Sequence, residues 1–305
     1  MRASNKIKIR YSIIHNDYVN KDIKVLVLSD IHFSRLVGTT TINQIEKQLI
    51  NQKPDYILIA GDLVDNPMYY LDKLEYSKVY DLLTRCGKIA KTLVILGNHD
   101  FIYEKVKPYQ DVFDKVNVFN NFNKINNVHI LIDENYEDDN IYVTGHMQKY
   151  ETYENEFYHK DNNFFESDIK KLISNTPNNK FKILLTHSPE PIILHNLEEL
   201  LKNYNIIVCG HNHDGCVPSF LDKIMPNNVG IIAPKKKLFP KVSRGIKKLK
   251  YNYLIMSGGW TKIHDCSPKI IHPLDKLCYR QIDIITITNN KKYKELEYKE
   301  DIINL

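Results

Sequence analysis

Long hydrophobic runs are missing from this chain of 305 residues. A membrane-spanning helix needs about 20 consecutive apolar residues, and no segment approaches that length, so we expect no such helix. The first residues, MRASNKIKIRYSII, alternate charged and apolar side chains and lack the continuous apolar stretch of a signal peptide. This alternation predicts a strand.

Cysteine is scarce, and a strong excess of one charge is absent. The five cysteines form an odd set without a CxxC pair, which argues against a disulfide framework and fits a reducing compartment. We therefore expect a cytoplasmic protein. The formal net charge is only +5, so overall charge alone does not indicate a nucleic-acid or membrane partner.

Five short apolar runs predict strands that are buried on both faces. Helical patterns lie between them, and this alternation favours an α/β layered fold in a single domain over residues 1–305. The strands are expected at 24–30, 56–62, 92–100, 182–188 and 205–211, and the helices at 41–52, 71–86, 164–174 and 190–202.

Two other regions favour antiparallel pairing. Residues 128–133 and 140–145 flank the turn-rich ENYEDD, as the strands of a hairpin would. After residue 250, three strand-like runs at 251–259, 281–288 and 291–299 follow with little helix between them. They predict a C-terminal meander.

Residue types that bind metals stand at the carboxyl end of each buried run. In open α/β sheets, ligands bind outside the carboxyl ends of the strands, so we expect these five tips to meet in one crevice. The tips are Asp30-x-His32, Gly61-Asp62, Gly97-Asn98-His99-Asp100, His187 and Gly210-His211-Asn212-His213.

The donor types at these tips indicate two divalent ions. Imidazole, carboxylate and amide oxygen together suit Mn first, with Fe, Zn or Ni as alternatives, whereas Mg and Ca prefer all-oxygen ligands. Seven candidate ligands exceed what one ion takes, since a tetrahedral ion has about four. Two ions about 3.5–4 Å apart are the usual arrangement for in-line displacement at phosphorus, with water as the nucleophile.

Each motif alone has an ordinary explanation. An Asp-x-His after a strand usually combines a capping carboxylate with a structural histidine, and Gly-Asp is a turn signal. The ordered occurrence of all five tips on five predicted strands makes that explanation weak for the set. His146 and His264 are further candidates to line the crevice.

The order SDIH, GDLVD, GNHD, THS and GHNH resembles the calcineurin-like metallophosphoesterase superfamily over nearly the whole chain, beginning near Lys24. The resemblance implies a four-layer α-β-β-α sandwich with two packed mixed β-sheets and a dinuclear metal site at the strand carboxyl ends. Within the superfamily the chain is most similar to small bacterial phosphoesterases that include lipid-precursor pyrophosphohydrolases. Those commonly carry an N-terminal membrane segment, which we do not expect here.

The resemblance also implies a role for each motif residue. His99 would contact the phosphoryl oxygen or protonate the leaving group, and Asp100 would orient the ring of His99. Asp62 would bridge the two ions. The first ion would be held by Asp30, His32, Asp62 and His213, and the second by Asp62, Asn98, His187 and His211.

Residues 234–250 hold eight basic residues in 17. Such a run is either a solvated loop or a patch for an anionic substrate or lipid surface, where Leu238 and Phe239 could insert. We expect a phosphorylated small molecule or lipid precursor as substrate. If the run is such a patch, it would make peripheral contact with an anionic membrane. Nucleic acid is a weaker alternative because aromatic residues are few there.

Together these patterns predict a metal-dependent phosphohydrolase that cleaves a phosphodiester, pyrophosphate or phosphomonoester bond by in-line attack of a hydroxide held between the ions. A nuclease is the alternative enzyme, although a nuclease would need a longer basic surface and usually has a capping domain. A non-catalytic scaffold that keeps the fold is the alternative of another class. The ligand set and His99 are all present, which disfavours the scaffold.

Overall fold

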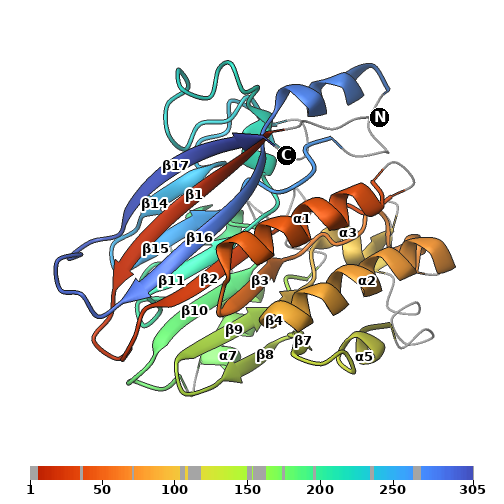
Figure 1. The fold of residues 1–305 in the computed structure, drawn as a ribbon. Coiled ribbons are helices and arrows are strands. Elements are labelled where there is room, and N and C mark those ends of the chain that lie inside the picture. The colour runs from red at the N-terminus through yellow and green to blue at the C-terminus, as the bar shows by residue number, and fades with distance from the viewer. Residues whose placement is uncertain are drawn as a thin grey trace.

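Two β-sheets packed face to face form the centre of the protein, with helices on both outer faces (Figure 1). The computed structural model describes residues 6–34, 37–70, 72–103, 107–108, 118–149, 153, 163–173, 176–194, 197–233, 237–263 and 269–304. This is the α-β-β-α arrangement that the motif resemblance implies.

The first sheet is mixed and has seven strands. Its parallel half consists of β2, β3, β4 and β7, while β1 and β16 run parallel to each other and antiparallel to β2. The strand order is β17 (Glu297–Asn304), β1 (Lys6–His15), β16 (Arg280–Thr288), β2 (Ile23–Leu28), β3 (Tyr56–Ala60), β4 (Lys91–Ile95) and β7 (Val128–Ile130).

The second sheet is also mixed and has six strands. Four central strands are parallel, and an antiparallel strand lies at each edge. The order is β14 (Gly245–Lys248), β15 (Tyr253–Met256), β11 (Ile206–Cys209), β10 (Phe181–Thr186), β9 (Ile141–His146) and β8 (Glu134–Glu137).

Three apolar clusters hold the four layers together. The cluster between the sheets joins β-branched and leucine side chains such as Val25 and Leu58 to Val143 and Ile183 opposite. Because both faces of these strands are covered, their sequences are continuous apolar runs. The two outer clusters pack α1 (Thr39–Gln52) and α2 (Lys73–Ile89) on the first sheet, and α7 (Asn163–Ile173) and α8 (Glu190–Leu194) on the second.

Short elements join the layers. They are η1 (Pro67–Tyr70), α3 (Asn98–Phe101), β5 (Ile102–Tyr103), β6 (Lys107–Pro108), α5 (Val118–Phe122), η3 (His213–Cys216), β12 (Ile232–Ala233), β13 (Lys237–Leu238) and η5 (Lys269–Leu277). None of the helices in the described part of the chain combines the length and the apolar character that crossing a bilayer requires.

The predicted hairpin of residues 128–133 and 140–145 is wrong. β7 joins the first sheet beside β4, whereas β9 lies in the second sheet beside β10. The antiparallel partner of β9 is β8, which is formed by part of the turn-rich ENYEDD segment. The chain therefore passes from one sheet to the other within the residues between β7 and β8.

The predicted C-terminal meander is also wrong. β15 belongs to the second sheet, and β16 and β17 belong to the first, where β1 lies between them. The helix predicted at 190–202 is α8, which ends at Leu194. The helices predicted at 41–52, 71–86 and 164–174 are confirmed as α1, α2 and α7, with ends shifted by up to three residues. The strand predicted in the first 14 residues is confirmed as β1, over Lys6–His15.

Candidate metal centre

The tips that follow β2, β3, β4, β10 and β11 meet at one edge of the two sheets. Backbone hydrogen bonds join them directly. The Asp30 amide donates to the Gly61 carbonyl at 3.0 Å, and the Gly210 amide donates to the His187 carbonyl at 2.9 Å. The two sheets are joined here because the His211 amide donates to the Asp30 carboxylate at 3.0 Å.

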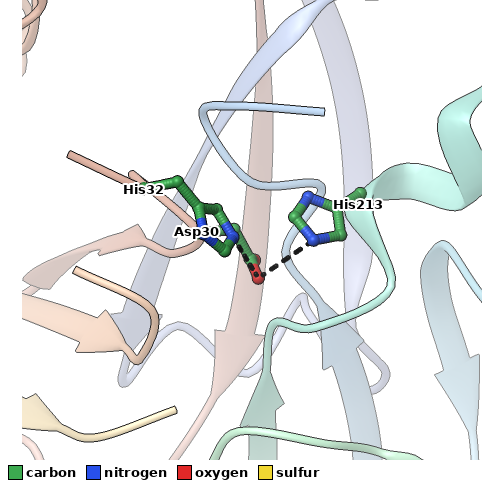
Figure 2. A group of neighbouring side chains, drawn as sticks. All are labelled: Asp30, His32 and His213. Carbon is green, nitrogen blue, oxygen red and sulfur yellow. Dashed lines mark ion pairs between the residues drawn. The ribbon is translucent and has the colours of Figure 1, made fainter. Parts of the chain in front are cut away.

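One group of candidate ligands consists of Asp30, His32 and His213, all buried. Figure 2 shows both rings facing the same carboxylate. The Asp30 Oδ1 lies 4.0 Å from His32 Nε2 and 3.8 Å from His213 Nε2. These separations leave room between the three donors for an ion that touches each of them.

A second group consists of Asp62, His187 and His211, also buried. Asp62 Oδ2 lies 3.0 Å from His187 Nε2 and 3.6 Å from His32 Nε2, which belongs to the first group. This oxygen therefore faces both groups. The buried Asn98 Oδ1 accepts no hydrogen bond from the described residues.

Backbone carbonyls fix the orientation of two histidines. His187 Nδ1 lies 2.6 Å from the Ala60 carbonyl oxygen, and His213 Nδ1 lies 2.7 Å from the Thr261 carbonyl oxygen. A neutral ring that donates from Nδ1 carries its lone pair on Nε2. In both residues Nε2 is the atom that faces the carboxylates, which is the tautomer that a metal ligand needs.

Five of the seven candidate ligands have a left-handed backbone conformation. Positive φ values occur at Asp30, His32, Asp62, His211 and His213. Left-handed backbone at residues other than glycine costs free energy and concentrates at functional sites.

The absence of a side chain at Gly97 lets the Asp62 carboxylate lie directly against the backbone of residue 97. A Cβ atom on Gly97 would lie 2.2 Å from Asp62 Oδ1. A side chain at position 97 would therefore displace the carboxylate that faces both groups.

The pKa values of the buried carboxylates and of His187 show that this site attracts positive charge. Burial by itself raises the pKa of Asp62, but the charges of His187, His99 and His32 hold it well below its usual range. Burial lowers the pKa of His187, yet the adjacent Asp62 raises it to about 9 overall. Burial raises the pKa of Asp30 to about 6. A proton on His187 therefore competes with a metal ion for the same place.

The predicted orientation of the His99 ring by Asp100 is wrong. His99 Nδ1 contacts the backbone carbonyl of Asp65 at 2.8 Å. The buried Asp100 carboxylate instead accepts from the backbone amides of Gly97 at 2.8 Å and Asp62 at 2.9 Å, and from the Tyr70 hydroxyl at 2.8 Å. Asp100 thus fixes the backbone that carries Asp62 and does not orient the His99 side chain.

Sequence reasoning missed Asp65. Its carbonyl holds His99, and its Oδ1 lies 3.5 Å from His32 Nδ1. The available signal was a second carboxylate in GDLVD, three residues after Asp62. A carboxylate behind a metal-binding histidine fixes the ring and increases its basicity.

The remaining candidates have simpler surroundings. His146 is buried, and its Nδ1 lies 3.2 Å from the Thr186 hydroxyl. His264 lies outside the described residues.

Directly after His213, the buried Asp214 pairs with Lys8 of β1 at 3.0 Å and with Arg244 at 3.4 Å.

A family model described as calcineurin-like phosphoesterase matches residues 23–215. Over 205 residues the chain is 26% identical to an uncharacterized metallophosphoesterase of Campylobacter jejuni, which covers 67% of this chain and 47% of that protein. Over 77 residues it is 39% identical to the phosphodiesterase YaeI of Escherichia coli, covering 25% of this chain and 27% of that protein.

The chain spans about half the length of the first curated relatives that it matches. Among solved structures, it is similar to a dimetal phosphatase of Danio rerio, with a TM-score of 0.43 and 9% identity. That match covers 79% of this chain and 88% of the fish protein.

Proposed function

This chain belongs to the calcineurin-like phosphoesterase family, and on that premise we propose that it is a metal-dependent hydrolase of phosphate esters. The observation that carries the proposal is the pair of adjacent buried donor groups, with Asp62 Oδ2 facing both. Two adjacent groups, each with a carboxylate and two imidazoles, suit two transition-metal ions.

The donor set fits such a centre. We assign Asp62 as the shared ligand because its Oδ2 faces both groups. We place the amide of Asn98 in the second group, as the motif resemblance implies. Its buried Oδ1 accepts no hydrogen bond from the described residues and could serve as a donor to an ion. The first ion would be held by Asp30, His32, Asp62 and His213, and the second by Asp62, Asn98, His187 and His211.

The chemistry that two bound ions supply is activation of water near neutral pH and neutralisation of charge on phosphate oxygens. The protein residues hold the geometry. Carbonyls at Ala60 and Thr261 keep Nε2 of His187 and His213 directed at the centre. With Nδ1 of His99 held by the Asp65 carbonyl, its ring meets a phosphate through Nε2, as an acid or a hydrogen-bond donor.

We propose manganese as the metal, because histidine and oxygen donors together suit Mn, Fe, Zn or Ni better than Mg or Ca. We propose a phosphorylated small molecule or a lipid precursor as substrate. The name of the Escherichia coli relative, phosphodiesterase, makes phosphodiesters the first bond to test, before pyrophosphates and phosphomonoesters.

We also propose that the protein works in the cytoplasm. The observation behind this is chemical: Cys86, Cys209, Cys216 and Cys278 are all free thiols, as expected in a reducing compartment.

Hydrolysis of bis-p-nitrophenyl phosphate tests the function. We expect turnover with added Mn²⁺, its loss on chelation and its return when Mn²⁺ is restored. Asp62→Asn should abolish it, while Asp81→Asn on α2 should not. Activity that survives chelation, or that is equal in Asp62→Asn, would contradict the proposal. A panel of nucleotides, nucleotide sugars, lipid precursors and DNA then ranks the substrates.

A further inference from the structure

Seven large hydrophobic side chains are exposed on three segments outside the metal centre. We call this surface the apolar platform; it comprises residues 218–225, the paired residues 229–233 and 237–241, and η5. Its exposed members are Phe220, Ile224, Leu238, Phe239, Ile270, Leu274 and Leu277. The five most exposed large hydrophobic side chains among the described residues, at 65% to 86%, all belong to it. A group of this kind indicates an interaction surface.

Hydrogen bonds join the first segment to η5, and the paired residues 229–233 and 237–241 are held by bonds to each other. The Ser219 amide donates to the Leu277 carbonyl at 2.7 Å, which links the first segment to η5. The Phe239 amide donates to the Ile231 carbonyl at 3.0 Å, and Val229 pairs with Lys241. Figure 1 shows the teal loops near residue 220 and the blue helical turns of η5 at the same end of the molecule.

Ion pairs and hydrogen bonds fix the apolar platform to the rest of the protein. Asp222 pairs with the buried Lys8 of β1 at 3.1 Å and with Arg244. In η5, Asp275 accepts from the amides of Lys262 at 2.7 Å and Ile263 at 3.2 Å. The two acidic side chains, Asp222 and Asp275, therefore face the protein, while the seven hydrophobic side chains are exposed.

Exposed charge on the apolar platform is positive. Lys223, Lys241 and Lys276 are exposed, whereas the acidic residues of the described segments, Asp222 and Asp275, are half-buried and hold the contacts just given. A lysine can lay its stem along an apolar surface and keep its ammonium group at the level of lipid phosphates.

Only part of the basic run 234–250 belongs to the apolar platform. Arg244 is buried against Asp214 and Asp222, and Lys248 pairs with Glu295 at 2.6 Å. Residues 234–236 lie outside the described part of the chain. The part of the run that belongs to the apolar platform is 237–241, and it pairs with residues 229–233, which lie outside the run.

We propose that the apolar platform docks on an anionic lipid bilayer. Exposed Phe, Leu and Ile side chains on segments that also expose lysines match an interface with an apolar interior and negatively charged headgroups. The apolar platform is connected to the metal centre through η5. Asp275 of η5 accepts a hydrogen bond from the amide of Lys262, the residue after Thr261, and the Thr261 carbonyl contacts Nδ1 of His213. This proposal goes beyond the hydrolase function and does not depend on it.

Vesicle co-sedimentation tests the proposal with the full chain. The probes are vesicles of phosphatidylglycerol and phosphatidylcholine, and vesicles of phosphatidylcholine alone, at low and high salt. We expect binding to the anionic vesicles that weakens strongly with salt. Triple substitution of Phe220, Ile224 and Ile270 by serine should weaken binding about tenfold or more, and triple substitution of Lys223, Lys241 and Lys276 by glutamate should do the same.

Leu74→Ser is the matched control, because Leu74 is 64% exposed on α2, outside the apolar platform. It should bind vesicles like the unmodified chain. All variants should keep their thermal unfolding midpoint and their turnover of bis-p-nitrophenyl phosphate. If the triple serine variant does not fold, the single substitutions Ile224→Ser and Ile270→Ser take its place, each with a smaller loss of binding.

Three results would overturn the proposal. The first is no binding of the unmodified chain to anionic vesicles. The second is equal binding by the control and the platform variants. The third is self-association in sedimentation velocity that the same substitutions abolish, with no vesicle binding, since this would assign the apolar platform to a second copy of the chain. Loss of phosphatase activity with retained vesicle binding would contradict only the proposed function.

Discussion

His99 is held by a backbone carbonyl, as His187 and His213 are. Its Nδ1 contacts the Asp65 carbonyl, and its ring lies edge-on to His32 with the ring centroids 4.8 Å apart. We expect His99→Ala to lower turnover of bis-p-nitrophenyl phosphate about 100-fold, the size of a lost general acid, with two manganese ions still bound. His129→Ala is the control. Loss of both turnover and metal would show that His99 is a ligand.

Asp138 provides a test of acid sensitivity away from the metal centre. Its carboxylate accepts from the Tyr56 hydroxyl at 2.7 Å and the Tyr136 hydroxyl at 2.9 Å. Burial by itself raises the pKa of Asp138, but these bonds and those from the Asn140 and Ile141 amides lower it overall.

A carboxyl group with a lowered pKa in the folded state stabilises the fold above its unfolded pKa, and this contribution is lost as the pH falls through the folded value. We expect Asp138→Asn to lower the free energy of unfolding by about 1 kcal/mol at neutral pH, since the group is partly exposed. Urea unfolding should show this difference shrinking toward pH 3. An equal difference at both pH values would contradict the assignment.

Among the elements, the tips of β3 and β4 depend on one buried carboxylate. Asp100 accepts from backbone amides on both tips and from Tyr70 in η1. In Asp100→Asn, an amide nitrogen would face these N–H groups. We expect a loss of about 3 kcal/mol in the free energy of unfolding and weaker manganese binding, because Asp62 is displaced.

Urea unfolding and calorimetric titration with Mn²⁺ measure the two effects of Asp100→Asn, with Asp81→Asn as control. A variant with unchanged stability and metal affinity but lower turnover would restore the idea that Asp100 acts directly on His99.

The strands themselves were predictable from apolar runs, but their partners were not. Periodicity predicts that residues 128–130 and 141–146 are strands, yet it does not say which sheet a strand joins. The short segment between β7 and β8 crosses between sheets, and β8 is an exposed edge strand rich in polar residues. Similarly, β1 separates β16 from β17 through pairings with residues more than 260 positions away.

For the molecule as a whole, the candidate ligands were predictable, because each follows a buried strand and metal donors are restricted to a few residue types. The groups that hold them were not. Lys8 and Arg10 look like the solvent-facing side of an alternating strand, but both are buried and paired, with Asp214 and Asp283 respectively. Partners more than 200 residues away leave no local signal in the sequence.

The central claim is that two ions share Asp62 at the edge of both sheets. Elemental analysis of the chain after loading with manganese and removal of free metal tests it most directly. We predict two manganese ions per chain, and close to none in Asp62→Ala, because that substitution removes a donor from both groups. A single ion in the unmodified chain, or two ions in Asp62→Ala, would contradict the claim.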